Sequence, residues 1–230
     1  MSDTDRKQHR PIRSFVRREG RITSAQKRAL EQLFPALGVR LNDGCLSFPS
    51  LFKNTNPVVC EIGFGNGQSL VDMAEAEPVV NYFGIEVYRP GVGNLLGQVE
   101  RRGLKNIRLS LDDAVQVFEQ QIPATSLARV QMFFPDPWHK KRHNKRRLIN
   151  LGFLDELARV IKADGLLHIA TDWEPYAEEV LELLTAHTKF ENTVATFALR
   201  PQWRPITKYE ARGHGLGHRV RDILFSRIQT

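Results

Sequence analysis

The chain has 230 residues, 41% of them hydrophobic, which suits one soluble α/β domain with a substantial core. Its two cysteines exclude a disulfide framework, no stretch approaches the roughly 20 apolar residues of a membrane helix, and the first ten residues are too polar for a secretory signal. The net charge of +7 predicts an acidic partner, and we expect a cytoplasmic location.

The positive charge is concentrated in two segments. Residues 1–28 hold nine Lys/Arg against three acids, a balance of +6, and residues 137–147 hold six Lys/Arg and no acid, another +6. The rest of the chain is therefore at −5. We expect residues 1–22 to form a basic arm and residues 23–230 to form a single domain.

After Pro57, short β-rich runs alternate with helix-like segments, the pattern of a parallel sheet covered by helices. A further strand is predicted within 190–198, and 200–219 is expected to be loop that orders on a partner. The predicted strands are 58–62, 82–87, 107–111, 130–134, 166–171 and 223–228. The predicted helices are 68–76, 92–102, 114–120, 148–161 and 176–186, the fourth ending at Asp164-Gly165.

A glycine turn closes the first of these strands, with the sequence Glu61-Ile62-Gly63-Phe64-Gly65-Asn66-Gly67. A dinucleotide fingerprint would need a glycine where Gln68 stands, which disfavours a nicotinamide or flavin oxidoreductase. Three glycines after an acid suit S-adenosylmethionine better. That cofactor has no pyrophosphate and carries positive sulfonium and ammonium groups, which carboxylates attract.

Acids end three successive strands. Glu61 ends the first and Glu86 the second, where two carboxylate oxygens can accept both ribose hydroxyls. Asp112 and Asp113 follow the third. We favour Asp113 as the acceptor from the adenine amino group, because Ala114 begins the next helix. The alternative is that these acids are ordinary polar residues at strand ends.

The fourth strand runs into Pro135-Asp136-Pro137-Trp138. The two prolines fix their own φ and bias the preceding residues toward extended geometry, so we expect them to hold the Asp136 carboxylate rigidly at the strand end. Methyltransferases acting on nitrogens of planar groups often have a related turn here. The alternative is a structural turn with Trp138 as a packing residue.

A basic block follows this turn directly and predicts phosphate contacts. A solvated charged face is the usual explanation of such a run, but the position beside the presumed reactive turn favours a nucleic acid. The pairs His139/His143 and His214/His218 are not expected to bind metal, because no acid or cysteine completes a set. The cations are Lys140, Lys141, Arg142, Lys145, Arg146 and Arg147.

Together these motifs resemble the bacterial tRNA (guanine(46)-N7)-methyltransferase family over nearly the whole chain, from about Arg13 to Arg227. The pairing of Pro-Asp-Pro-Trp with Arg-His-Asn-Lys-Arg-Arg is highly specific to that family. The other segments are Ser14-Phe15-Val16-Arg17-Arg18, Glu61-Ile62-Gly63-Phe64-Gly65, Gly84-Ile85-Glu86-Val87, Ala170-Thr171-Asp172-Trp173 and Thr207-Lys208-Tyr209-Glu210.

The resemblance implies a Rossmann-like class I methyltransferase fold, with a seven-stranded, mostly parallel sheet, helices on both faces and an antiparallel C-terminal hairpin. It implies Asp136 as the catalytic position, and tRNA as the partner, with no obligate protein partner evident. The implied cofactor positions are Glu61, Gly63, Gly65, Glu86, Asp113 and Asp136. The implied substrate positions are Lys140, Asp172, Thr207, Lys208, Tyr209 and Glu210. The implied RNA contacts are Arg142, His143, Asn144, Lys145, Arg146 and Arg147.

The expected activity is methyl transfer from S-adenosylmethionine to N7 of the variable-loop guanosine at tRNA position 46. Two alternatives stay open on sequence grounds. One is a class I methyltransferase acting on rRNA or a protein amide, and the other is a non-catalytic RNA-binding protein on the same fold.

Overall fold

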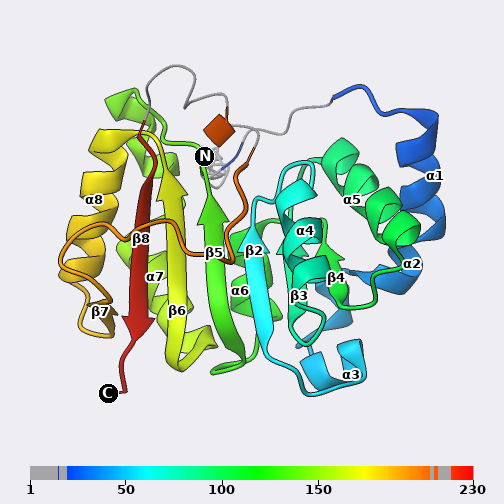
Figure 1. The fold of residues 1–230 in the computed structure, drawn as a ribbon, viewed down its shortest axis with the longest axis horizontal. Coiled ribbons are helices and arrows are strands. Elements are labelled where there is room, and N and C mark those ends of the chain that lie inside the picture. Colours follow the sequence, from blue (N-terminus) through cyan, green and yellow to red (C-terminus); the bar gives the residue numbers. More distant parts are fainter. Residues whose placement is uncertain (1–14, 16–19, 208–209, 212–218, 230) are drawn as a thin grey trace, which may run out of the picture.

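The computed structural model describes residues 15, 20–207, 210–211 and 219–229. Within them a sheet of eight strands has the order β1-β4-β3-β2-β5-β6-β8-β7 (Figure 1). Strands β1 to β6 pair in parallel, and β8 is antiparallel to both β6 and β7. The strands are β1 Gly38–Val39, β2 Val58–Ile62, β3 Asn81–Ile85, β4 Ile107–Ser110, β5 Leu127–Phe133, β6 Ile161–Thr171, β7 Phe190–Asn192 and β8 Arg221–Arg227.

The predicted fold class is confirmed, with one strand more than the seven expected. The extra strand is β1, whose two residues pair with the outer edge of β4. The sequence analysis also missed the helices before β2. For α1 a signal was available, because Thr23 and Gln26 form a capping box at its start. The helices are α1 Ser24–Gln32, α2 Phe34–Leu37, α3 Phe48–Phe52, α4 Gln68–Ala76, α5 Arg89–Arg102, α6 Ala114–Gln120, α7 Leu151–Val160 and α8 Glu174–Thr185, with 3-10 helices η1 Leu41–Asp43 and η2 Lys141–Arg146.

The predictions for β2, α4 and α6 match the observed bounds, and the largest boundary error lies between α7 and β6. The sequence placed the end of the helix at Asp164-Gly165. In the structure, Ile161 already pairs with Leu127 and is fully buried, so the strand begins five residues earlier than expected. Asp164 has φ +60°, and the β5–β6 register shifts nearby, so the dipeptide marks an irregularity inside the strand.

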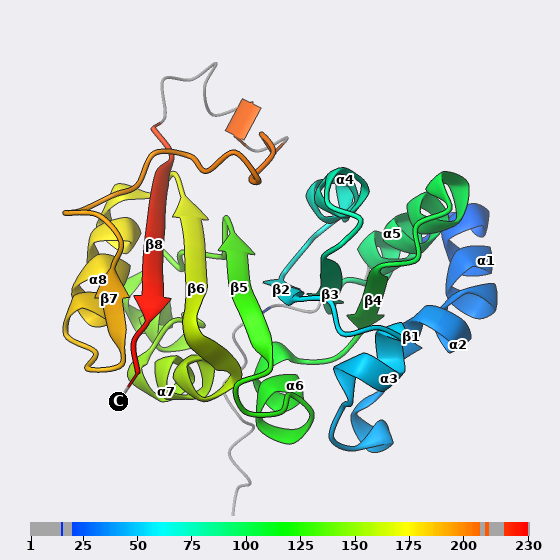
Figure 2. The ribbon, with the colours of Figure 1, turned by 60° about the horizontal axis from the view of Figure 1, so that its bottom comes forward.

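Each face of the sheet has its own hydrophobic core. Cys60 of β2 points to one face, where apolar side chains of α6, α7 and α8 pack. Val59, its neighbour, points to the other face, where α1, α4 and α5 cover β2, β3 and β4. Alternation along the strands therefore buries both faces, as a doubly wound sheet requires (Figure 2).

The second face is completed by an extended segment, residues 193–207, which crosses β8, β6 and β5 (Figure 1). Thr193 and Ala198 donate backbone hydrogen bonds to Leu224 and Asp222 of β8. Arg204, within the region expected to be loop ordered by a partner, is fully buried. This part of the region is loop, as expected, and it packs on the sheet of the same chain in place of a helix.

Two predicted features lie largely outside the described residues. Of the basic arm 1–22, the structure describes only Phe15 and residues 20–22. Lys208 and Tyr209, two predicted substrate contacts, and His214 and His218 are also outside. No helix in the described part of the chain has the length and apolar character needed to cross a bilayer.

Candidate active site

The glycine turn after β2 leaves open space at the carboxyl edge of the sheet. Gly63 and Gly65 adopt φ of +75° and +58°, the left-handed region that side chains disfavour. A Cβ atom built on either glycine would meet no heavy atom within 4 Å among the described residues. The turn therefore presents bare backbone to a space that a ligand could fill.

Glu86, one residue beyond β3, ties the second strand to this turn. Its Oε2 accepts from the Gly65 backbone N–H at 2.7 Å, and its Oε1 accepts from Val87 and Tyr88 at 2.7 and 3.0 Å. Burial raises the pKa of Glu86, these backbone donors oppose the rise, and the charge of Asp136 adds to it. Oε1 already accepts two of these bonds and Oε2 only one, so Oε2 can still receive a ribose hydroxyl.

Glu61 lies at the end of β2 and is almost fully buried. Its carboxylate accepts from Gln131 Nε2 at 2.9 Å. Burial raises the pKa of Glu61 to about 7, the Gln131 bond and the charge of Arg129 lower it, and the charge of Glu86 raises it. A cation bound beside it would stabilise its ionised form, and S-adenosylmethionine carries such groups.

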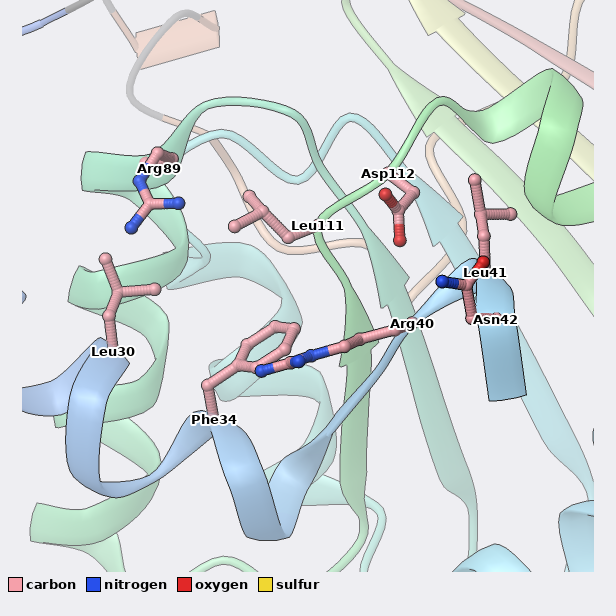
Figure 3. Close-up of a pocket in the computed structure, with 8 residues that line it drawn as sticks. All are labelled: Leu30, Phe34, Arg40, Leu41, Asn42, Arg89, Leu111 and Asp112. Atoms are coloured by element: carbon pink, nitrogen blue, oxygen red, sulfur yellow. The ribbon is translucent and has the colours of Figure 1, made fainter.

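The two adjacent acids after β4 have different roles. Asp113 caps α6, its Oδ1 accepting from Val115 N at 3.0 Å. Asp112 instead lines a cavity of about 520 Å³ between the N-terminal helices and the start of α5 (Figure 3). The adenine contact predicted for Asp113 stays a prediction, and Asp112 is a second candidate. The cavity is lined by Leu30, Phe34, Arg40, Leu41, Asn42, Arg89, Leu111 and Asp112.

The turn after β5 carries Asp136 into an exposed position. Phe134 and Trp138 on either side of it have φ of +55° and +46°, unusual for residues with side chains. The extended geometry that the prolines predicted is therefore wrong for Phe134. The turn holds backbone strain of a kind that clusters at functional sites, where surrounding contacts maintain it.

Three residues of the basic block are among those contacts. Arg147 is buried, donates to the Pro137 carbonyl at 2.8 Å, pairs with Glu179 and stacks over Tyr176. Arg146 stacks over Trp138, with 5.0 Å from its guanidinium carbon to the ring centre. Asn144, in the amide orientation that satisfies its neighbours, donates to the Trp138 carbonyl at 3.0 Å.

The remaining cations of the block face outward. Lys140, Lys141, Arg142 and Lys145 are exposed, and His143 packs edge-on against Trp138. Partial desolvation and the positive charge of its neighbours lower the pKa of His143, which favours its neutral form. The block thus has an inner side that supports the turn and an outer side available to phosphates.

The turn after β6 meets the turn after β5. Trp173, next to Asp172, packs edge-on against His139 with ring centres 4.3 Å apart. Asp136 and Asp172 therefore lie on adjoining turns at the carboxyl edges of neighbouring strands. The Thr207 hydroxyl accepts from Glu210 N at 3.1 Å, and the Thr207 carbonyl accepts from Ala211 N at 2.9 Å.

Within the described residues, no group of three or more His, Cys, Asp and Glu is arranged to hold a metal ion. The site consists of carboxylates, backbone amides and cations.

Comparison with known proteins identifies the family. A family model described as "Putative methyltransferase" matches residues 55–223. The tRNA (guanine-N(7)-)-methyltransferase of Aeromonas hydrophila is 50% identical, over 97% of this chain and 95% of its own length. That of Francisella tularensis subsp. novicida is 48% identical, over 99% and 100%. The chain belongs to the tRNA (guanine-N(7)-)-methyltransferase family.

Solved structures support the fold alone. The 16S rRNA methyltransferase KamB has a TM-score of 0.56 at 13% identity, with 78% of this chain and 94% of KamB covered. The [4+2]-cyclase SpnF reaches 0.51 at 17% identity, with 76% of each chain covered. A methyltransferase and a cyclase thus share this architecture, so the fold alone does not define the activity.

Several contacts that build the site in this methyltransferase family member were not predicted. Gln131 holds Glu61, and Arg204 engages the Glu210 carboxylate at 2.5 Å. Arg147, predicted to contact RNA, has its guanidinium engaged inside the protein. No local motif marks Gln131 or Arg204, because Gln131 pairs with Glu61 on another strand and Arg204 also pairs with Asp222 of β8. The roles assigned to the site residues stay predictions.

Substitutions on the inner and outer sides of the basic block should affect the stability of the protein to different extents. Arg147→Ala should lower the free energy of unfolding by about 1–3 kcal/mol, because it leaves the partly buried Pro137 carbonyl without its charged donor. Lys145→Ala should change it by less than about 0.5 kcal/mol, as for an ordinary surface site. Urea unfolding measures both values. Equal stabilities of the two variants would contradict the conclusion that Arg147 supports the turn with Asp136.

Proposed function

We propose that this protein transfers the methyl group of S-adenosylmethionine to N7 of a tRNA guanosine, at variable-loop position 46, and that it does so in the cytoplasm. One observation carries the proposal. The acids expected to bind the cofactor, the turn with Asp136 and the outward-facing basic block lie next to one another at the same edge of the sheet. The family relationship, with relatives named as tRNA (guanine-N(7)-)-methyltransferases, agrees with it.

The residues present fit S-adenosylmethionine, which would supply an electrophilic methyl group on a sulfonium centre. Gly63 and Gly65 would accommodate its amino-acid part, since both have open space where a Cβ would lie. Buried Glu61 would pair with its ammonium group, and Oε2 of Glu86 would accept from a ribose hydroxyl. Asp112 or Asp113 would accept from the adenine amino group.

The chemistry needs no general base. Guanine N7 carries a lone pair in the plane of the base and loses no proton when it is methylated. Positive charge develops on the purine during transfer, and a fixed carboxylate at Asp136 would stabilise that charge and orient the base for in-line attack.

A carboxylate could also accept from guanine N1–H and N2–H, which would select guanine over adenine. Asp136 and Asp172 are both candidates for this role. The base has to leave its contacts within the tRNA to reach either of them, as base-modifying enzymes generally require.

The deciding experiment measures transfer of labelled methyl from S-adenosylmethionine to unmodified tRNA transcripts with guanosine or adenosine at position 46. Label in the guanosine transcript alone, recovered as 7-methylguanosine, is expected. Label in both would move the target base elsewhere. Label in neither, with the cofactor still bound, would reject tRNA and turn attention to rRNA and protein substrates.

The raised pKa of Glu61 predicts that the affinity for the cofactor depends on pH. Its ionised form binds the cationic cofactor, and with a pKa of about 7 it is protonated as the pH falls. Between pH 7 and 5.5 the dissociation constant should rise by up to tenfold per pH unit, with the cofactor amino group protonated throughout. Titration calorimetry measures it. Glu61→Gln should bind weakly and lose the pH dependence.

In the cofactor-free protein, Glu61 should make the free energy of unfolding depend on pH in the opposite direction, with more stability at low pH. Because the folded-state pKa of Glu61 is raised, its contribution to stability is largest at low pH and is lost as the pH rises from about 4.5 through 7. At pH 8, Glu61→Gln should therefore be more stable than the unmodified protein, by roughly 3 kcal/mol at 1.4 kcal/mol per pKa unit, and the two should converge below pH 5. Equal stabilities at pH 8 would contradict the raised pKa.

A further inference from the structure

The face of the sheet formed by β5, β6 and β8 carries polar side chains where the neighbouring part of the same face, over β2, β3 and β4, carries an apolar core. The cover on these strands is the extended segment that follows β7 (Figure 1). We call these side chains, with their partners in that segment, the polar layer. Its members are Arg129, Gln131, His168, Asp222, Trp203, Arg204 and Glu210.

Arg204 is the centre of the polar layer. Its side chain is fully buried, and its guanidinium lies over the ring of Phe133. Nε and Nη2 donate to the two oxygens of Asp222 at 2.7 and 2.9 Å. Nη1 and Nη2 donate to the two oxygens of Glu210 at 2.5 and 3.0 Å. One arginine therefore grips two carboxylates, each through both of its oxygens.

Asp222 is the fixed end of this arrangement. It belongs to β8, and its Oδ1 is also 2.7 Å from Nε2 of His168 on the neighbouring strand β6. Burial acts to raise the pKa of Asp222, but the hydrogen bonds from His168 and Arg204 and the positive charge of Arg204 lower it overall, so the carboxylate is ionised. The sheet thus sets the orientation of Asp222, and Asp222 sets that of Arg204.

Glu210 is the end whose position depends on Arg204. Its N–H donates to the Thr207 hydroxyl at 3.1 Å, and Ala211 N donates to the Thr207 carbonyl at 2.9 Å. We call these three residues, Thr207, Glu210 and Ala211, the turn. They end the described part of the covering segment, which lies near the carboxyl ends of β5 and β6 (Figure 2). Thr207 and Glu210 are predicted substrate positions, yet the Glu210 side chain is buried against Arg204 and faces the protein.

We propose that Arg204 is a positioning residue for the tRNA substrate: by joining Asp222 of the sheet to Glu210, it holds Thr207, Glu210 and Ala211 near the carboxyl ends of β5 and β6 in the geometry that receives tRNA. The proposal rests on the proposed function, since it assigns this part of the site to tRNA. Glu210 acts here as an anchor and not as a contact to the substrate.

The test compares Arg204→Lys with Arg159→Lys in the full-length protein. Lysine keeps the buried charge but cannot make the two-sided grip. Arg159 is the matched control, because it also grips a carboxylate, Glu156, through two nitrogens and donates to the carbonyls of Phe118 and Ile122. It lies in α7, distant from the turn.

For Arg204→Lys we expect kcat/KM for tRNA to fall about 10- to 100-fold, mostly through KM, while the dissociation constant for S-adenosylmethionine changes less than twofold. Amide hydrogen exchange in peptides covering 198–211 should accelerate. Arg159→Lys should leave all three quantities within twofold of the unmodified protein. Kinetics and exchange for Arg204→Lys equal to those of Arg159→Lys would overturn the proposal.

A double variant separates positioning from direct contact. If Arg204 acts through Glu210, Arg204→Lys/Glu210→Gln should be no worse than the more impaired single variant. Multiplied defects would instead mean that the two residues act independently, which also overturns the proposal. Should the unmodified protein methylate no tRNA, the proposed function fails, and hydrogen exchange in Arg204→Lys still decides whether Arg204 orders the turn.

Discussion

Asp136→Ala is expected to lower kcat for methyl transfer to tRNA by about 10²- to 10³-fold, the usual effect of removing a fixed group that stabilises charge developing in the transition state. The fold should be intact, because Asp136 is exposed and the contacts that hold its turn come from Arg146, Arg147 and Asn144. Single-turnover methyl transfer, with urea unfolding alongside, measures both effects.

The same substitution should also change the pKa of Glu86. The charge of Asp136 raises the pKa of Glu86, so its removal should let Glu86 ionise at lower pH. The control is Asp155→Ala, which removes an exposed acid from α7. Full activity in Asp136→Ala would remove Asp136 from the mechanism, and an equal loss in Asp155→Ala would show that the defect is not specific to the turn.

The second large effect concerns the outer side of the basic block. Replacing Lys141, Arg142 and Lys145 together by serine should raise KM for tRNA by about 10- to 100-fold at 0.15 M salt. Each cation that neutralises a phosphate releases counterions, so the slope of log affinity against log salt should become shallower by about 0.7–0.9 for each phosphate that the variant no longer neutralises. Filter binding across a salt series gives the slope directly.

A charge-matched control lies at the opposite edge of the sheet. Arg101, Lys105 and Lys162 are exposed at the end of α5, before β4 and at the start of β6, so their replacement by serine lowers the net charge equally. If binding depended on net charge alone, both triple variants would lose affinity to the same extent. We expect the control to keep its tRNA affinity and its salt slope within experimental error.

The sequence alone determined the architecture and the positions of the acids. Hydrophobic periodicity predicted β2, α4 and α6 with their observed bounds, since these elements depend on neighbours close in the chain. The parallel pattern placed Glu61, Glu86 and Asp136 at the ends of parallel strands, and such ends meet at one edge of a sheet. The glycine turn and the basic block could also be recognised in the sequence, because each is a short, continuous run of residues.

Only the tertiary structure decided how these pieces are held. Glu61 meets Gln131 across 70 positions of the chain, and Asp222 joins His168 across 54 and Arg204 across 18. The inward orientation of Arg147 depends on Glu179 and Tyr176 of a later helix, and the division of roles between Asp112 and Asp113 depends on where the α6 backbone begins. A buried polar side chain is stable only where the fold supplies its partner, and local sequence does not contain that partner.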